Sequence, residues 1–297
     1  MTLGHGLSQQ AASPILCAVD QSMPSDTALR VAVSLAGVLH RPLHLVHVWS
    51  GAIATAAEGQ ARRFLSDAAA DADAESYHFE INGSADGIAN VAERISADLV
   101  VIGTHSRGRL GRFLLGSTAG QVLHRARWPL LVVRAETSWP PRQIVIGEDS
   151  SEAAAYAGGM AAAISAAYGA AVTLVEAVPE LIMPIASADP TGRKVAKVFN
   201  KTKAHVDNRA AAIGAAGGHS PHGTVSLVAP DRALMDTIRS CTPALLVVGH
   251  RSTIEMRDGN HRSVAESLIR TAHAPILIYP EAAVDKSVAT RKHLAPV

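Results

Sequence analysis

Short, continuous runs of apolar residues alternate with longer amphipathic segments along the first half of the chain. The apolar runs are rich in β-branched residues, as expected of strands covered on both faces, and they span Ile15–Val19, Leu43–Val48, Leu99–Ile102 and Leu130–Val133. A weaker strand is predicted near Tyr77–Ile81. Apolar residues at helical spacing predict helices over Thr27–Leu39, Ala61–Ala74, Asp86–Ile95 and Thr118–Arg127. Strands that alternate with helices are typical of a parallel, doubly wound α/β sheet with right-handed crossovers.

The same pattern occurs twice in the chain. Ile15–Ser22, an apolar run that ends at an Asp followed by small polar residues, matches Ile144–Ser151. Further along, Ser117–Pro129 aligns with Ser263–Pro275 without a gap. The sequence therefore predicts a tandem duplication of one α/β domain.

The repeat boundaries predict how the chain is divided. We expect two domains over residues 14–135 and 143–280, a flexible N-terminus (1–13), a linker (136–142) and a C-terminal tail (281–297). The linker contains successive prolines, which resist both helix and sheet hydrogen bonding.

The second half is longer than the first. Asp20 and Gly103 are 83 positions apart, whereas their counterparts Asp149 and Gly249 are 100 apart, a difference of 17. We place the extra residues between Pro179 and Arg193, a stretch that contains two prolines.

Composition excludes several classes of protein. Lys and Arg number 27 against 26 Asp and Glu, and aromatic residues make up 4%, which argues against a nucleic-acid binder. Cys17 and Cys241 are far apart and form no CxxC pair, so we expect neither a disulfide framework nor a thiolate metal site. This use of cysteine also predicts a cytoplasmic location. The N-terminus lacks the basic and apolar regions of a signal peptide.

Ala153–Val175 has no charged residue, but it is rich in Ala, Gly and Ser. We interpret it as a buried helix followed by a strand, and we expect no membrane segment.

Candidate chemistry lies at the ends of two predicted strands. Asp20 closes the first strand and Gly103 closes the fourth. In an open α/β sheet, ligands bind beyond the carboxyl ends of the strands, at the point where strand order reverses. These two residues therefore mark the expected site.

The segment after the fourth strand favours an anion. Gly116 and Ser117 precede a predicted helix, and a helix N-terminus offers unpaired N–H groups and partial positive charge. Arg107, Arg109 and Arg112 add positive charge, and no Asp or Glu lies between positions 98 and 136. This pattern predicts a phosphate site.

Neither a P-loop nor G-x-G-x-x-G is present, but the first half contains Gly103-x2-Ser106-x9-Gly116-Ser117. Together with Asp20, this pattern resembles the universal stress protein family in its tandem two-domain form, whose nucleotide-binding members show G-x2-G-x9-G-[ST]. The resemblance runs from about position 14 to 280 and occurs twice in register. It implies two five-stranded parallel sheets in the order 3-2-1-4-5, and binding of ATP, or of AMP or ADP, accompanied by Mg²⁺.

The resemblance also assigns residues. Adenine and ribose lie near the end of the first strand and Val48, and the phosphates lie near the loop after the fourth strand. The full set is Ala18, Val19, Asp20, Val48, Ile102, Gly103, Thr104, His105, Ser106, Arg107, Gly116, Ser117 and Thr118. Ser106 replaces the second glycine of the motif, which is unfavourable if that position needs a positive φ.

The second half departs further from the motif, because it contains Gly249-x2-Ser252-x9-Arg262-Ser263 after the fourth strand, with Asp149 at the end of the first. Arg262 replaces the glycine that faces phosphate, so it either fills the anion's place or reaches the other domain's ligand. Our hypothesis is that the first domain binds nucleotide and that the second site is degenerate.

Several alternatives remain open. Asp20 can be a helix N-cap, and Gly116-Ser117 can be a helix start without a ligand. The preferred function is a stress-response protein that senses adenine nucleotide. The alternatives are a regulatory module that docks an unknown protein partner, and a very slow ATPase for which the sequence offers no well-placed general base. No metal-binding motif accompanies the fourteen histidines.

The resemblance also implies dimerisation through the fifth strands. Leu130–Arg134 and Ile276–Pro280 can pair within one chain as a pseudo-dimer, and two tandem chains are then expected to associate as a homo-oligomer.

Overall fold

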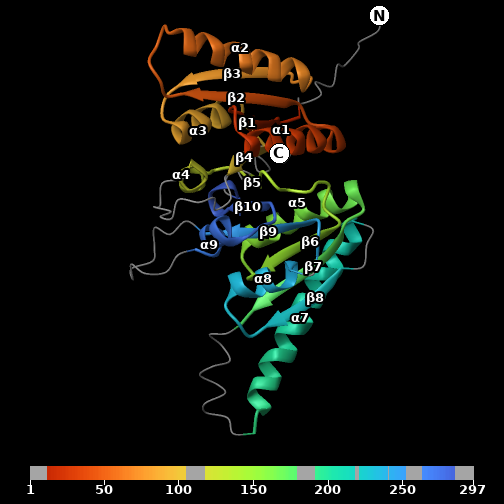
Figure 1. Ribbon diagram of the computed structural model, residues 1–297. Coiled ribbons are helices and arrows are strands. Elements are labelled where there is room, and N and C mark those ends of the chain that lie inside the picture. The colour runs from red at the N-terminus through yellow and green to blue at the C-terminus, as the bar shows by residue number, and fades with distance from the viewer. Residues whose placement is uncertain are drawn as a thin grey trace, which may run out of the picture.

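The computed structural model describes residues 12–104, 118–178, 191–217, 221–239, 241–251 and 263–284. Ten strands form one sheet in the order β3-β2-β1-β4-β5-β10-β9-β6-β7-β8, with helices on both faces (Figure 1). Each half contributes five parallel strands in the order 3-2-1-4-5. The predicted doubly wound fold and strand order are therefore confirmed.

The elements of the first half follow the predicted alternation. They are β1 (Ile15–Ala18), α1 (Met23–Leu39), β2 (Leu43–Trp49), α2 (Ala56–Asp71), β3 (Ser76–Ile81), α3 (Ser84–Arg94), β4 (Leu99–Thr104), α4 (Thr118–Arg125) and β5 (Leu130–Arg134). Successive side chains of a strand point to opposite faces of the sheet. One face therefore packs under α1 and α2, and the other under α3 and α4.

The second half repeats this order. Its elements are β6 (Gln143–Glu148), α5 (Glu152–Tyr168), β7 (Ala171–Ala177), α7 (Arg193–Gly217), β8 (His222–Ser226), α8 (Pro230–Ile238), β9 (Ala244–His250), α9 (Val264–Thr271) and β10 (Ile276–Pro280). The uncharged stretch near position 160 is helix α5 followed by strand β7, as predicted. No helix in the described ranges is long and apolar enough to cross a membrane.

The two halves join through their fifth strands. β5 and β10 pair antiparallel, with Leu131 opposite Leu277. Between α4 and α9, His124 Nε2 lies 3.2 Å from Glu266 Oε1. The buried guanidinium of Arg134 donates to the carbonyl oxygen of Ile269 on α9. The expected pairing of the fifth strands within one chain is therefore confirmed. Because this pairing is antiparallel, the carboxyl ends of the five strands of one half point in the opposite direction to those of the other half.

The placement of the extra length in the second half was only partly right. The segment between β7 and α7 (178–192) is longer than the one between β2 and α2 (50–55). However, α7 has 25 residues whereas its counterpart α2 has 16. About half of the insertion therefore lies inside a helix, whose beginning extends away from the sheet in Figure 1.

Two histidines predict that acid destabilises the fold. Burial lowers the pKa of His78, and the charge of the neighbouring His44 lowers it further. His44 Nδ1 lies 3.2 Å from His78 Nε2. Burial also lowers the pKa of His250. Because both folded pKa values lie below the unfolded value of about 6.5, the unfolded chain binds more protons, and stability falls as pH decreases through that value.

We therefore expect a lower unfolding temperature at about pH 5.5 than at about pH 7.5, and a smaller drop in the double variant His78→Gln, His250→Gln. Calorimetry at both pH values measures the two drops. Glu176 contributes with the opposite sign, because burial raises its pKa and the folded state takes up its proton first as pH falls. Equal drops in the wild type and the variant would contradict the assignment to these histidines.

Candidate functional site

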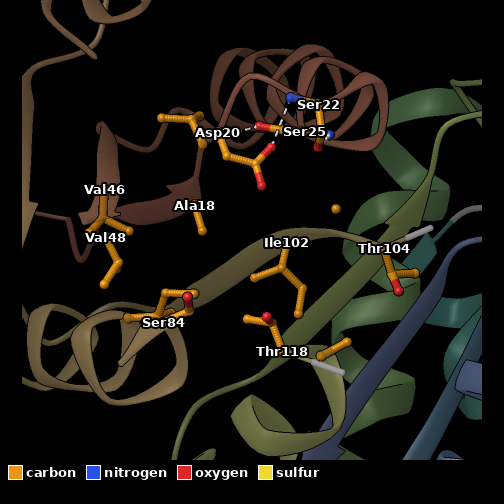
Figure 2. Close-up of a pocket in the computed structure, with 14 residues that line it drawn as sticks. Ala18, Asp20, Ser22, Ser25, Val46, Val48, Ser84, Ile102, Thr104 and Thr118 are labelled. Atoms are coloured by element: carbon orange, nitrogen blue, oxygen red, sulfur yellow. Dashed lines mark hydrogen bonds between the residues drawn. The ribbon is translucent and has the colours of Figure 1, made fainter. Parts of the chain in front are cut away.

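A cavity of about 370 Å³ lies between the carboxyl ends of β1 and β4, where the strand order reverses. We call it the crevice. Its walls come from both strands, from β2, and from the first turns of α1, α3 and α4 (Figure 2). The lining residues are Ala18, Val19, Asp20, Ser22, Ser25, Val46, Val48, Ser84, Ile88, Ile102, Gly103, Thr104, Thr118 and Ala119.

One wall of the crevice is apolar. Val46 and Val48 lie together on β2, with Ala18 and Ile102 between them and α4 in Figure 2. A Cβ at Gly87 of α3 would lie 2.7 Å from Val48 Cγ1, so the absence of a side chain there lets α3 pack tightly behind Val48. This packing fixes the aliphatic wall of the crevice.

The carboxylate of Asp20 also lines the crevice, beside Ser22 and Ser25 (Figure 2). Its Oδ1 accepts a hydrogen bond from the backbone N–H of Ser22 at 3.0 Å, and its own N–H donates to Ser25 Oγ at 2.8 Å. No described residue bonds its other oxygen, Oδ2. Ser22, rather than Asp20, is the N-cap of α1, so the interpretation of Asp20 as the cap was wrong. Asp20 Oδ1 therefore orders the turn that follows β1.

Gly103 has a packing reason to be glycine. A Cβ there would lie 2.6 Å from the carbonyl carbon of Pro24 in the first turn of α1. Gly249 occupies the same place in the second half, where a Cβ would lie 2.7 Å from the backbone nitrogen of Ala154. Glycine is thus required at both positions for helix packing, whether or not a ligand binds.

Helix α4 begins at the crevice. Thr118 and Ala119 line it, and the first turn of α4 contains no acidic residue. The N-terminus of this helix therefore favours an anion. The remaining predicted residues of the phosphate loop, His105, Ser106, Arg107, Gly116 and Ser117, lie outside the described residues.

All eight described residues of the predicted set line the crevice, namely Ala18, Val19, Asp20, Val48, Ile102, Gly103, Thr104 and Thr118. Sequence reasoning missed Ser22, Ser25, Val46, Ser84, Ile88 and Ala119. Val46 could have been found from the alternation of side chains along β2, because it lies two residues before Val48 and shares its face.

The second half has a different arrangement at the matching point. Asp149 Oδ1 accepts from the N–H of Ser151 at 3.0 Å, which repeats the turn of the first half. However, its Oδ2 forms an ion pair at 3.2 Å with Arg251, which directly follows β9. The ion pair bridges the ends of β6 and β9, across the place where the crevice lies in the first half.

Ser263 also has a role without a ligand, because it is the N-cap of α9 and its Oγ accepts from the N–H of Glu266 at 3.1 Å. The other predicted residues of this second site, Ser252 and Arg262, lie outside the described residues.

A pair of acidic residues, of which Glu148 is buried and Glu176 half-buried, further separates the second half from the first. Glu148 and Glu176 are neighbours across β6 and β7. Glu148 Oε2 accepts from Arg209 Nε of α7 at 3.3 Å, whereas Glu176 Oε2 is buried and has no hydrogen-bond partner among the described residues. The aligned positions of the first half are Val19 and His47. Across the described ranges, no group of three or more His, Cys, Asp or Glu side chains is arranged to hold a metal ion.

The duplicated 3-2-1-4-5 sheet, with a crevice where strand order reverses, defines a tandem doubly wound α/β protein. Residues 12–134 and 141–280 both match the model of the universal stress protein family. The chain therefore belongs to the universal stress protein family.

Known relatives match parts of the chain. A universal stress protein of Mycolicibacterium smegmatis is 29% identical over 141 residues, which cover 41% of this chain and 48% of the relative. One of Mycobacterium tuberculosis strain H37Rv is 33% identical over 134 residues, covering 41% of this chain and 45% of the relative. The chain thus spans about half the length of these curated relatives.

A solved structure at 16% identity shares the fold. A universal stress protein from Archaeoglobus fulgidus superposes with a TM-score of 0.66 at 16% identity, over 91% of this chain and 98% of the other. Another structure from that organism, in complex with dAMP, is 29% identical over 40% of this chain and 96% of its own, with a TM-score of 0.33.

Proposed function

We propose that the crevice of the first half binds an adenine nucleotide, with ATP as the expected ligand, and that the protein acts as a nucleotide-responsive regulatory protein in the stress response. The observation that carries the proposal is the crevice itself. It combines an aliphatic wall, a carboxylate whose Oδ2 is bonded by no described residue, and a helix N-terminus within about 370 Å³, a size in the range of small-molecule sites.

Each part of the crevice suits one part of the nucleotide. Val46 and Val48 offer apolar contact to the adenine ring, and Asp20 Oδ2 can accept a hydrogen bond from a ribose hydroxyl. The phosphates, with Mg²⁺ as their counter-ion, are expected near Thr118 at the start of α4, where backbone N–H groups and the helix dipole favour negative charge.

We expect one nucleotide per chain. The ion pair between Asp149 and Arg251 engages the oxygen that corresponds to Asp20 Oδ2, which no described residue bonds in the first half. A ligand in the second half would have to break this pair before it could use the same oxygen.

The first experiment is to denature freshly purified protein and identify released nucleotide by mass spectrometry, alongside calorimetric titration with Mg-ATP, ADP and AMP. ATP at about one equivalent per chain supports the proposal. An empty protein that also ignores all three nucleotides contradicts it and favours the alternative module that docks a protein partner.

Asp20→Asn tests the ribose contact with little disturbance of the fold. The asparagine Oδ1 still accepts from the N–H of Ser22, but the charged acceptor is lost. We expect nucleotide affinity to fall roughly fivefold, the difference of about 1 kcal/mol between a charged and a neutral hydrogen bond. The matched control, Asp149→Asn, changes the same turn in the second half and should leave affinity unchanged. If Asp149→Asn lowered nucleotide affinity more than Asp20→Asn does, the nucleotide site would lie in the second half and the proposal would be wrong.

A further inference from the structure

The two ends of the molecule carry surfaces that the nucleotide proposal does not use. Because β5 pairs with β10 inside the chain, the strands left at the sheet edges are β3 and β8. In Figure 1 they lie towards opposite ends of the molecule, β3 beside α2 and β8 beside α7. Any association of tandem chains through a sheet edge must therefore use these ends.

The end formed by α2 and β3 is acidic. Asp67, Asp71, Asp73 and Glu75 are all exposed, and we call them the acidic edge. No Lys or Arg occurs between positions 63 and 94. Within the described ranges, Asp67, Asp71 and Asp73 form no ion pair. The adjacent strand β3 also exposes two large apolar side chains, Tyr77 (51%) and Ile81 (45%), which is unusual for an edge strand.

The end formed by α7 is basic. Its first three turns carry Arg193, Lys194, Lys197, Lys201 and Lys203, which we call the basic arm. No Asp or Glu occurs in α7 before Asp207, which forms an ion pair with Lys203, and the other four arm cations are exposed. Val206 is the first described residue of α7 that is buried. The arm thus belongs to the part of the helix that extends away from the sheet (Figure 1).

We propose that the basic arm of one chain docks on the acidic edge of a second copy, head to tail. The net charge of the chain is only +1, so the two surfaces reflect a separation of charge between its ends rather than an overall excess. Opposite patches at opposite ends are complementary between copies, and Tyr77 and Ile81 add apolar area beside the acidic edge. Such a contact is heterologous and leaves one arm and one acidic edge unused, so it can repeat from copy to copy as an open chain or a closed ring.

Two other partners for the basic arm, a nucleic acid and a membrane surface, account for fewer of these observations. A nucleic acid would use the cations and leave the acidic edge without a role. A membrane surface would need exposed apolar residues on the arm, but Val195, Val198 and Phe199 are half-buried.

Sedimentation velocity of the full chain tests the proposal. We expect the average mass to rise with protein concentration at about 50 mM NaCl and association to weaken roughly tenfold or more at about 500 mM, because salt screens exposed charges. A mass that stays that of one chain at every concentration in low salt overturns the proposal.

Charge reversal identifies the surfaces. One variant reverses the arm (Arg193→Glu, Lys197→Glu, Lys201→Glu), and the other reverses the acidic edge with Asp67→Lys, Asp71→Lys and Glu75→Lys. Each alone should lose self-association, whereas an equimolar mixture should regain it, because the acidic arm of one variant then meets the basic edge of the other. Unchanged melting curves show that both variants fold.

Two results overturn the proposal in this format. One is a mixture that stays dissociated although both variants are folded. The other is a wild type that does not self-associate but binds duplex DNA through an arm whose reversal abolishes that binding, which would assign the arm to nucleic acid.

Discussion

Replacing Arg209 by methionine is expected to lower the free energy of unfolding by about 3 kcal/mol, the lower end of the range for breaking a buried ion pair, because the Arg209 side chain itself is 30% exposed. The side chain of Glu148 is 1% exposed, and Arg209 is its cationic partner. Without Arg209, the carboxylate remains buried beside Glu176, whose pKa is already raised by burial.

The first half provides the control for this prediction. The residue of the first half that aligns with Glu148 is Val19, so the same fold accommodates an uncharged side chain at this position. The double variant Glu148→Val, Arg209→Met removes both charges and should recover most of the lost stability in urea denaturation. A double variant no more stable than Arg209→Met would show that Arg209 acts through packing rather than through its charge.

Gly103→Ala is expected to destabilise the protein by about 3 kcal/mol, because the new Cβ would overlap backbone rather than a flexible side chain. Its nearest atom would be the Pro24 carbonyl carbon at 2.6 Å, so α1 has to move away from β4. This movement also displaces Asp20 and Ser25 at the crevice, so nucleotide affinity should fall together with stability. Urea denaturation and calorimetric titration measure the two effects.

Gly159→Ala is the matched control for the glycine change. Gly159 lies in the middle of α5 and is exposed, and a Cβ added there would meet no described atom within 4 Å. Alanine at this position should raise the free energy of unfolding by about 0.5–1 kcal/mol through helix propensity alone. If Gly159→Ala also lowered the free energy of unfolding, the clash with Pro24 would not be the cause of the stability lost in Gly103→Ala.

The fold was predictable because the pattern of apolar residues that specifies it occurs twice in the chain. Strands covered on both faces appear as continuous apolar runs, and the repeat in register supported the alternation of strands and helices. Helix starts were less accurate, since α1 and α2 begin at Met23 and Ala56, four and five residues before the predicted Thr27 and Ala61. These helices begin at polar caps and small residues, where apolar periodicity is weak.

The site was predictable where topology determines it. Asp20 and Gly103 follow from the rule that ligands bind where strand order reverses. The ion pairs of the second half were not predictable, because Arg251 and Asp149 are 102 residues apart and Arg209 and Glu148 are 61 apart. Which side chains meet at such distances depends on helix orientation, which a single sequence does not encode in its local pattern.

The antiparallel pairing of β5 with β10 changes how the two halves respond to dilution. Two separate single-domain chains joined by such strands would dissociate as the protein concentration falls, because their contact obeys mass action. Here a short linker holds the halves at an effective concentration in roughly the millimolar range, which does not depend on how much protein is present. The second half can therefore support the first at any expression level, even though an ion pair spans the place of its own crevice.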